Sequence, residues 1–250
     1  MKILDDVLTS LDFSATVKDI RLGVRHTGVF SRGCGLASTL THDAFKQEDP
    51  HMVEPGYLLA KTAQELAMMA NSARIMEAAI GMATINSLIQ FDEANCVAIN
   101  ASEILAEKGR GKKVAIIGHF PFIPALKERV GHLWVVEKNV RQGDFAEQEA
   151  DSILPLADVV GITGTAFTNH TLEHLLEMCQ PEAYILMLGD TTPMSPVLFD
   201  YGIDAVCGVK VINTGLALNC VSQGANFRQI RGIKLLTMFK DSNLTVHISN

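Results

Sequence analysis

The sequence lacks closely spaced cysteines and any sign of a secretory leader. Its 5 cysteines are scattered over 250 residues without a C-x-x-C motif, a pattern typical of reduced, mostly buried thiols in a cytoplasm. Asp5 and Asp6 occupy the region in which a signal peptide needs positive charge and then an apolar run. We therefore expect a cytoplasmic protein.

Long apolar runs and an excess of basic residues are missing too. The most apolar helical stretch, residues 66–89, is interrupted by Asn71, Arg74, Glu77 and Asn86, so we expect no membrane span. The formal net charge of −7 and the absence of a basic stripe argue against a nucleic-acid partner. With 48% hydrophobic residues, the chain can bury the core of one large or two small domains.

A strand, a glycine turn and a helix start follow one another between Lys112 and Leu126. Residues 114–117 are apolar and largely β-branched, as in a strand buried on both faces of a parallel sheet. Gly118 predicts a sharp turn, and Pro121 suits the first turn of a helix. Ligands of such sheets bind beyond the carboxyl ends of the strands. We therefore expect Gly118, His119, Phe120 and Pro121 to line a site.

This turn is not a dinucleotide-binding fingerprint. If Gly118 is the first glycine of G-x-G-x-x-G, then Phe120 and Ile123 stand at the second and third glycine positions. Those glycines admit the pyrophosphate and allow close packing of helix on strand. The sequence therefore predicts neither NAD nor FAD as a cofactor.

The remaining pattern predicts an α/β protein in two domains. Apolar runs predict further strands at residues 133–137, 157–163, 183–188 and 205–211, with helices near 122–130, 171–178, 195–201 and 214–222. This alternation predicts a Rossmann-like, five-stranded, mainly parallel sheet. Before it, a helix (3–11), strands (17–30 and 33–40), a polar loop (42–55) and helices (57–70 and 73–89) predict a small α+β unit. We place the domains at residues 1–95 and 96–250.

Glu137 ends the second strand of the predicted sheet, 19 residues after Gly118 (137 − 118). An acidic residue at about this spacing accepts hydrogen bonds from a ribose in Rossmann proteins, although a solvated glutamate is the simpler alternative. Because neighbouring strands end at one edge, His119 is expected beside it. We interpret Glu137 as the centre of function, with His119 as a proton-transfer group or ligand.

Hydroxyl and amide side chains follow the third predicted strand. Thr163, Gly164 and Thr165 end this strand, and Asn169 and Thr171 begin the next helix. A helix N-terminus with such groups favours anions, although helix capping alone explains some of them.

The fourth predicted strand ends in a stiff polar loop. It contains Gly189, Asp190, Thr191, Thr192 and Pro193. Asp190 is a candidate base or metal ligand, but a turn residue is at least as good an interpretation.

Two other groups are weaker candidates. Arg25 stands at the end of a predicted strand in the first domain, where it could reach an anionic ligand across the domain interface, although a surface arginine is the default. His170 and His174 have the i, i+4 spacing of one helical face but lack the glutamate and third ligand of a zinc motif. We interpret them as a surface pair.

Four of these motifs together resemble a small prokaryotic family described as putative heavy-metal chelation. They are Gly118-His-Phe-Pro-Phe, the strand-ending Glu137, Thr163-Gly-Thr with Asn169-x-Thr171, and Gly189-x-Thr-Thr-Pro-x-Ser-Pro196. The resemblance covers most of the chain. It implies an enolase N-terminal-like domain before a Rossmann-like domain, with the site between them. Asp190 departs from the family pattern, in which proline follows this glycine.

Two functions remain open. The first is handling of a divalent or heavy metal, or of a metal-bearing small molecule, in the interdomain cleft, with Glu137, His119 and Asp190 as ligands or proton-transfer groups. The second is non-catalytic binding of a nucleoside-like or anionic metabolite. A structural subunit of a metalloenzyme is a weaker third interpretation. The sequence identifies neither the metal nor the reaction, and it leaves a homo-oligomer open.

Overall fold

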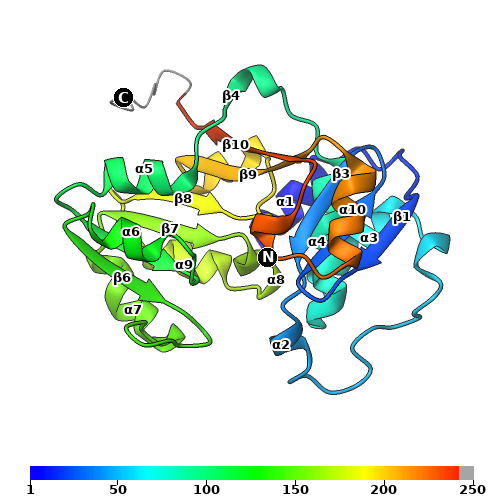
Figure 1. Cartoon of the computed structure of the whole chain (residues 1–250), viewed down its shortest axis with the longest axis horizontal. Coiled ribbons are helices and arrows are strands. Elements are labelled where there is room, and N and C mark those ends of the chain that lie inside the picture. The colour runs from blue at the N-terminus through cyan, green and yellow to red at the C-terminus, as the bar shows by residue number, and fades with distance from the viewer. Residues whose placement is uncertain (242–250) are drawn as a thin grey trace.

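The computed structural model describes residues 1–241 of the chain. They form a seven-stranded sheet and a separate three-stranded sheet, which lie side by side with helices packed on both (Figure 1). Within these residues, every helix falls short of the length and apolar character that crossing a bilayer requires.

The large sheet confirms the predicted parallel core. Its strand order is β4-β10-β9-β8-β7-β5-β6. The five predicted strands are β5 (Lys113–Ile117), β6 (His132–Val136), β7 (Val159–Thr163), β8 (Tyr184–Leu188) and β9 (Ala205–Val211), and all run parallel to one another. β5 pairs with β6 on one side and with β7 on the other, so the strand predicted at residues 114–117 is internal.

The prediction of five strands was wrong, because two antiparallel strands extend the sheet. β10 (Ile233–Phe239) pairs along the full length of β9, and β4 (Cys96–Val97) pairs with β10. β10 returns after α10 (Thr214–Ser222) and the short η7 (Phe227–Gln229), and β4 has only two residues. Neither strand fits the strand–helix alternation on which the prediction rested.

Side chains of β5 alternate between two cores, as a strand covered on both faces requires. Val114 and Ile116 pack into the core formed with α5 (Ala101–Lys108) and α6 (Ile123–Lys127), and Ala115 packs into the opposite core. The second core includes buried residues of α7 (Ala150–Ile153), α8 (Thr165–Thr168) and α9 (Leu172–Met178). Short 3-10 turns, η3 (Glu93–Asn95), η4 (Glu147–Glu149) and η5 (Leu154–Leu156), join these elements.

The small sheet is an antiparallel meander of β1 (Asp19–Leu22), β2 (His26–Phe30) and β3 (Cys34–Ser38). It differs from prediction because residues 17–30 form two strands around a turn, instead of one bent strand. The segment predicted as a loop begins with the short helix α2 (Thr41–Ala44).

The helical part of the first unit is also more broken than predicted. Residues 57–70 divide into η1 (Leu58–Ala60), α3 (Ala63–Met68) and η2 (Met69–Asn71), because a capping box at Thr62 starts a new helix. α4 (Ile75–Leu88) was expected to bury one face, but 12 of its 14 residues are buried. Its small residues let backbones approach closely, and a Cβ on Gly35 of β3 would lie 2.2 Å from the carbonyl oxygen of Ala83.

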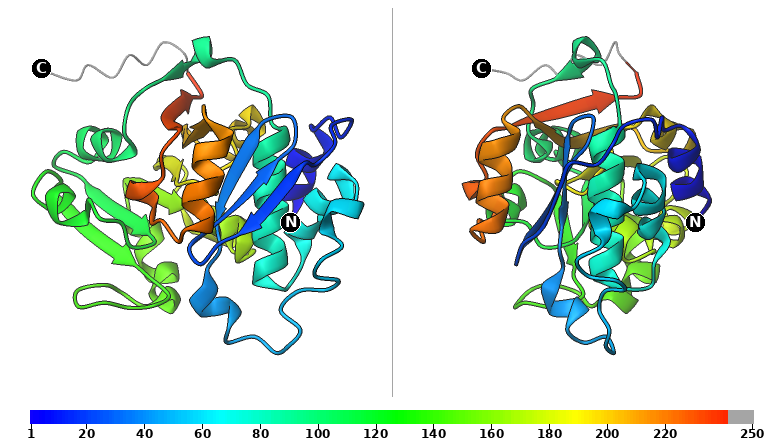
Figure 2. Two further views of the ribbon diagram at one scale, coloured as in Figure 1. Left: turned by 45° about the vertical axis from the view of Figure 1, so that its right-hand side comes forward. Right: turned by 90° about the vertical axis from the view of Figure 1, so that its right-hand side faces the viewer.

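An N-terminal helix packs on the unit of the large sheet, and a helix from the C-terminal part of the chain packs on the small sheet. α1 (Lys2–Thr9) packs on η6 (Pro196–Tyr201), and the Ile3 backbone N–H donates to the Glu173 carboxylate in α9 at 2.9 Å. α10 packs on β1 and β2, as Figures 1 and 2 show. A Cβ on Gly28 would lie 2.5 Å from Leu218 of α10. The division into domains at residues 1–95 and 96–250 stays a prediction, because α1 packs on the unit of the large sheet and α10 packs on the small sheet.

Candidate functional site

Two adjoining cavities lie at the carboxyl edge of the large sheet. Cavity A has a volume of about 550 Å³ and lies over the ends of β5, β6 and β7. Cavity B has a volume of about 840 Å³ and lies over the ends of β5, β7, β8 and β9. Ser38, His119, Phe120 and Thr163 line both, so the two cavities form one cleft. Ser38 belongs to the small sheet, and the cleft therefore lies where the two sheets meet.

Most of the predicted site residues line this cleft. Cavity A contacts Gly118, Glu137, Thr165, Asn169 and Thr171, and cavity B contacts Pro121, Gly164, Gly189, Asp190 and Thr191. The reason is topological, because parallel strands bring all the loops that follow them to one edge of the sheet.

Glu137 braces the turn that follows β5. Its Oε2 accepts the backbone N–H of His119 at 2.8 Å, and its Oε1 accepts the backbone N–H of Asn139 at 3.0 Å. Gly118 has a φ of +102°, a conformation that residues with a Cβ rarely adopt. The carboxylate thus holds two loops together, and lone pairs remain on both oxygens for a ligand in cavity A.

His119 is oriented by an aspartate that the sequence did not single out. Its Nδ1 lies 2.9 Å from Oδ2 of Asp144, whose side chain is only 4% exposed. Asp144 is itself held by the backbone N–H of Arg141 at 3.1 Å. Because Nδ1 is engaged, Nε2 is the ring atom that can reach a ligand. Asp144 lies 25 residues beyond His119, in a loop without a regular pattern, so no local signal marks it.

The loops after β7 and β8 are packed directly on one another. A Cβ on Gly164 would lie 2.4 Å from the backbone nitrogen of Thr192. Thr163 and Thr165 share a hydroxyl–hydroxyl hydrogen bond at 3.0 Å. Asn169, at the end of α8, has an enclosed Oδ1 without a hydrogen-bond donor in residues 1–241. This loop therefore presents two hydroxyls and an unsatisfied amide at cavity A.

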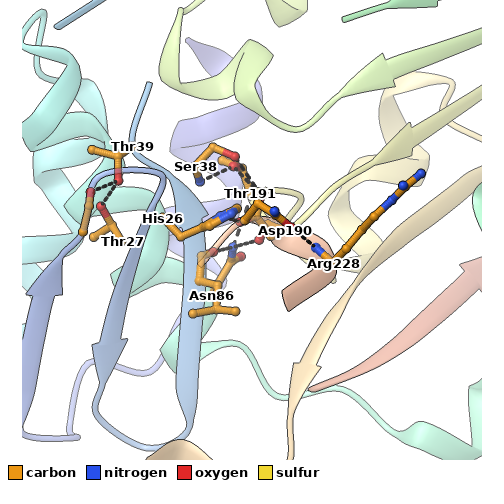
Figure 3. Close-up of polar contacts among 11 residues, drawn as sticks. His26, Thr27, Ser38, Thr39, Asn86, Asp190, Thr191 and Arg228 are labelled. Carbon is orange, nitrogen blue, oxygen red and sulfur yellow. Dashed lines mark hydrogen bonds and ion pairs between the residues drawn. The ribbon is translucent and has the colours of Figure 1, made fainter. Parts of the chain in front are cut away.

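Asp190 is buried in a polar network that joins the two sheets, as Figure 3 shows. Its Oδ2 lies 2.5 Å from His26 Nδ1, and its Oδ1 accepts the Ser38 hydroxyl at 2.9 Å. Thr191 accepts the Ser38 backbone N–H at 2.9 Å. The Asn86 amide donates to the backbone carbonyl oxygens of Leu36, Asp190 and Thr191.

This network bears on the predicted role of the β8 loop. Asp190 was a candidate base or metal ligand, with a turn residue as an equally good interpretation. Both of its oxygens bond His26 or Ser38, and its role in a site stays a prediction. Thr192 and Pro193 were expected to bind a ligand, but they are buried and line neither cavity. The small sheet and α4 cover this loop, a contact that sequence spacing does not reveal.

The structure places Arg25 away from the cleft, and its predicted contact with an anionic ligand stays a prediction. Arg25 is exposed in the turn before β2, its carbonyl oxygen accepts from Thr39, and it lines neither cavity. Its neighbour His26 enters the cleft instead. The arginine that lines cavity B is Arg228, in η7.

His170 and His174 do not share a helical face. α9 begins at Leu172, and His170 precedes it with a φ of +57°. The His170 ring bonds the Ala70 carbonyl oxygen at 2.9 Å, whereas His174 lies 3.1 Å from Asp151 and lines cavity A.

The protein side chains do not form a closed metal site in the part of the chain that the structure describes. Residues 1–241 contain no group of three or more His, Cys, Asp or Glu side chains arranged to hold a metal ion. Burial raises the pKa of the thiols of Cys34, Cys179 and Cys207 to about 12, and this disfavours the thiolate form that binds soft metals. His119, which lines both cavities, has an arrangement typical of a metal ligand, an imidazole held by a carboxylate.

The chain matches two family models, both with the description "Putative heavy-metal chelation". The DUF364 model matches residues 100–239, and the DUF4213 model matches residues 5–89. An uncharacterised protein of Methanocaldococcus jannaschii is 29% identical over 167 residues, which span 63% of this chain and 64% of that protein.

Two solved structures share the whole fold. A DUF364 family protein of unknown function from Desulfitobacterium hafniense is 27% identical, with a TM-score of 0.82, over 96% of this chain and 97% of its own. Another, from Pyrococcus horikoshii, is 23% identical with a TM-score of 0.82, over 95% of this chain and 98% of its own. The first family model spans more than half of the sequence, and the chain belongs to the DUF364 family described as "Putative heavy-metal chelation".

Proposed function

We propose that the protein handles a metal ion carried by a small organic ligand, which binds in the cleft formed by cavities A and B. The family description supports a metal. The volumes of about 550 and 840 Å³ exceed what a bare ion needs and lie in the range of organic ligand sites. If the organic ligand supplies most of the metal's donor atoms, the protein needs no closed metal site of its own. Such a ligand is therefore consistent with the lack of a closed metal site within residues 1–241.

The observation that carries this proposal is the His119–Asp144 pair. The carboxylate at 2.9 Å fixes the imidazole and makes its free nitrogen a better donor. His119 lines both cavities, so Nε2 would complete the coordination of a metal whose other ligands come from the organic molecule. When bound, such a metal would supply a Lewis-acid or redox centre.

We expect the metal and the organic molecule to remain bound to the protein together during purification. Protein purified anaerobically without chelators would be studied by elemental analysis and by native mass spectrometry. We expect metal and a small-molecule mass in equal amounts, and at least a tenfold lower occupancy in His119→Ala. His132→Ala is the matched control, because His132 is exposed at the opposite end of β6. Equal metal in His119→Ala, or full loading of stripped protein by metal salts alone, would contradict the proposal.

The second candidate is a binder of an anionic metabolite without a metal. Arg228 favours it, because this cation lies beside the apolar walls of cavity B, which include Phe120 and Phe227. Native mass spectrometry separates the two candidates. An anionic mass that is present without metal, and that is lost in Arg228→Gln but kept in His119→Ala, would favour the metabolite binder.

Other sequence expectations remain predictions. Phe120, at the position of the second glycine of a dinucleotide site, stacks on Phe122 with ring centroids 5.2 Å apart, and titration with NADH tests the prediction that NAD does not bind. A cytoplasmic location, a homo-oligomer and the absence of a nucleic-acid partner also stay predictions.

A further inference from the structure

Cavities A and B differ in the polar side chains that line them. Cavity A carries the carboxylates, amides and hydroxyls of Asp43, Glu137, Asn139, Asn169 and Thr165 among its apolar surface. Cavity B carries Arg228 and fewer carboxylates. A ligand that occupies the whole cleft therefore meets an end rich in acceptor groups and an end that carries an arginine.

Asp43 is an enclosed polar group of cavity A whose hydrogen-bonding capacity is not filled. It belongs to α2, its side chain is only 8% exposed, and its Oδ1 has no hydrogen-bond donor among residues 1–241. The Oδ1 of Asn169, across the cleft in the large-sheet unit, is enclosed and unpaired in the same way. Enclosed acceptors without donors are unfavourable and rare in native proteins. Two of them on one cavity wall indicate a ligand that brings hydrogen-bond donors.

The charges around Asp43 favour hydroxyl donors over cations. Lys46 Nζ and Lys138 Nζ each lie 3.6 Å from one of its two carboxylate oxygens. An ammonium group or a metal ion placed here would meet two like charges. A phosphate would meet the carboxylates of Asp43 and Glu137 in the same wall. A neutral hydroxyl donates to the carboxylate and accepts from a lysine, so it satisfies both.

The rest of the wall suits several hydroxyls at once. Glu137 keeps free lone pairs after accepting two backbone N–H groups. Thr163 and Thr165 share one hydrogen bond between their hydroxyls, and each hydroxyl keeps at least one position for a further partner. Acceptors and donors are therefore spread around cavity A, as recognition of a compact polyol requires.

We infer that cavity A binds a neutral polyhydroxyl group of sugar or cyclitol type, with Asp43 and Asn169 as hydrogen-bond acceptors. This inference rests on the proposed function, in that the same ligand would extend into cavity B. It assigns the small unit a direct binding role, because Asp43 comes from the segment between β3 and α4.

Free D-ribose and myo-inositol serve as probes, in saturation-transfer NMR on metal-free protein. We expect saturation transfer to both polyols, none to choline, and no displacement of the polyols by inorganic phosphate. Asp43→Asn and Asn169→Ala should each weaken polyol binding at least tenfold. The control is Glu48→Gln, an exposed carboxylate in the same segment, and it should bind as the parent does.

Asp43→Asn keeps the size of the side chain, and Asn169→Ala provides an independent test from the other side of the cleft should either variant misfold. Absence of polyol binding by the parent, or unchanged binding by both variants, would overturn the inference. Metal retention in His119→Ala is measured separately, so polyol binding that persists there shows that only the metal part of the proposed function has failed.

Discussion

The imidazole of His26 and the carboxylate of Asp190 lie 2.5 Å apart and connect β2 of the small sheet to the loop after β8 of the large sheet. Both residues are only 6% exposed. Breaking a buried pair by removing one partner is strongly destabilising, because the other partner is left without compensation. The pair therefore helps to fix the two sheets relative to each other, and so the shape of the cleft.

Asp190→Ala should lower the free energy of unfolding by about 1–3 kcal/mol, the size expected when a buried hydrogen-bonding group loses its partner. The Ser38 hydroxyl loses its acceptor in the same variant. Urea unfolding measures the change, with Asp200→Ala, an exposed aspartate, as the control. A loss no larger than that of the control would show that the pair contributes little.

Glu137→Gln should destabilise the β5 and β6 loops as well as change the site. A glutamine has one acceptor oxygen, so one of the two N–H groups from His119 and Asn139 would face an amide NH₂. The expected loss is about 0.5–1.5 kcal/mol, the net contribution of a typical hydrogen bond, because neither of the two N–H groups is fully buried. Hydrogen exchange at these two amides reports it directly, and the exposed Glu128→Gln serves as the reference. Unchanged protection of both amides would refute the bracing role.

Glu93 should give the protein a stability that acid removes. Lys210 and Lys234 hydrogen-bond its carboxylate and hold its pKa below the usual 4.5. A lowered folded-state pKa stabilises the protein above the unfolded value, and this contribution disappears as the pH falls through the folded-state pKa. Parent and Glu93→Gln should therefore differ in Tm at pH 7 and converge well below pH 4.5. A difference that persists at low pH, or that salt leaves unchanged, would exclude the ion pairs as its source.

Gly164→Ala should loosen the contact between the β7 and β8 loops. The added methyl group would lie 2.4 Å from the Thr192 backbone nitrogen, which cannot move aside as a flexible side chain does. A loss of about 1–3 kcal/mol is expected for overpacking of this kind. Gly215→Ala is the control, since its Cβ would meet only Asn213 Oδ1 at 3.9 Å. Equal Tm values for the two variants would contradict the tight contact.

The sequence by itself determined the parallel sheet and the edge at which the site lies. Short apolar runs that alternate with helical segments specify strands β5 to β9, because a strand covered on both faces must be apolar throughout. Parallel connection then places the residues after each strand at one edge. This is why Gly118, Glu137 and Thr163 could be placed at this edge without any knowledge of contacts.

Only the tertiary structure decided which of those residues remain free to bind. Asp190 reads as an open candidate in the sequence, yet His26 and Ser38 occupy its oxygens from strands more than 150 positions earlier. Asp144 and Asp43 carry no local motif, and they matter only because folding places one against His119 and the other in the wall of cavity A. The order of residues fixes which side chains reach the edge of the sheet, whereas long-range packing fixes which of them are already satisfied.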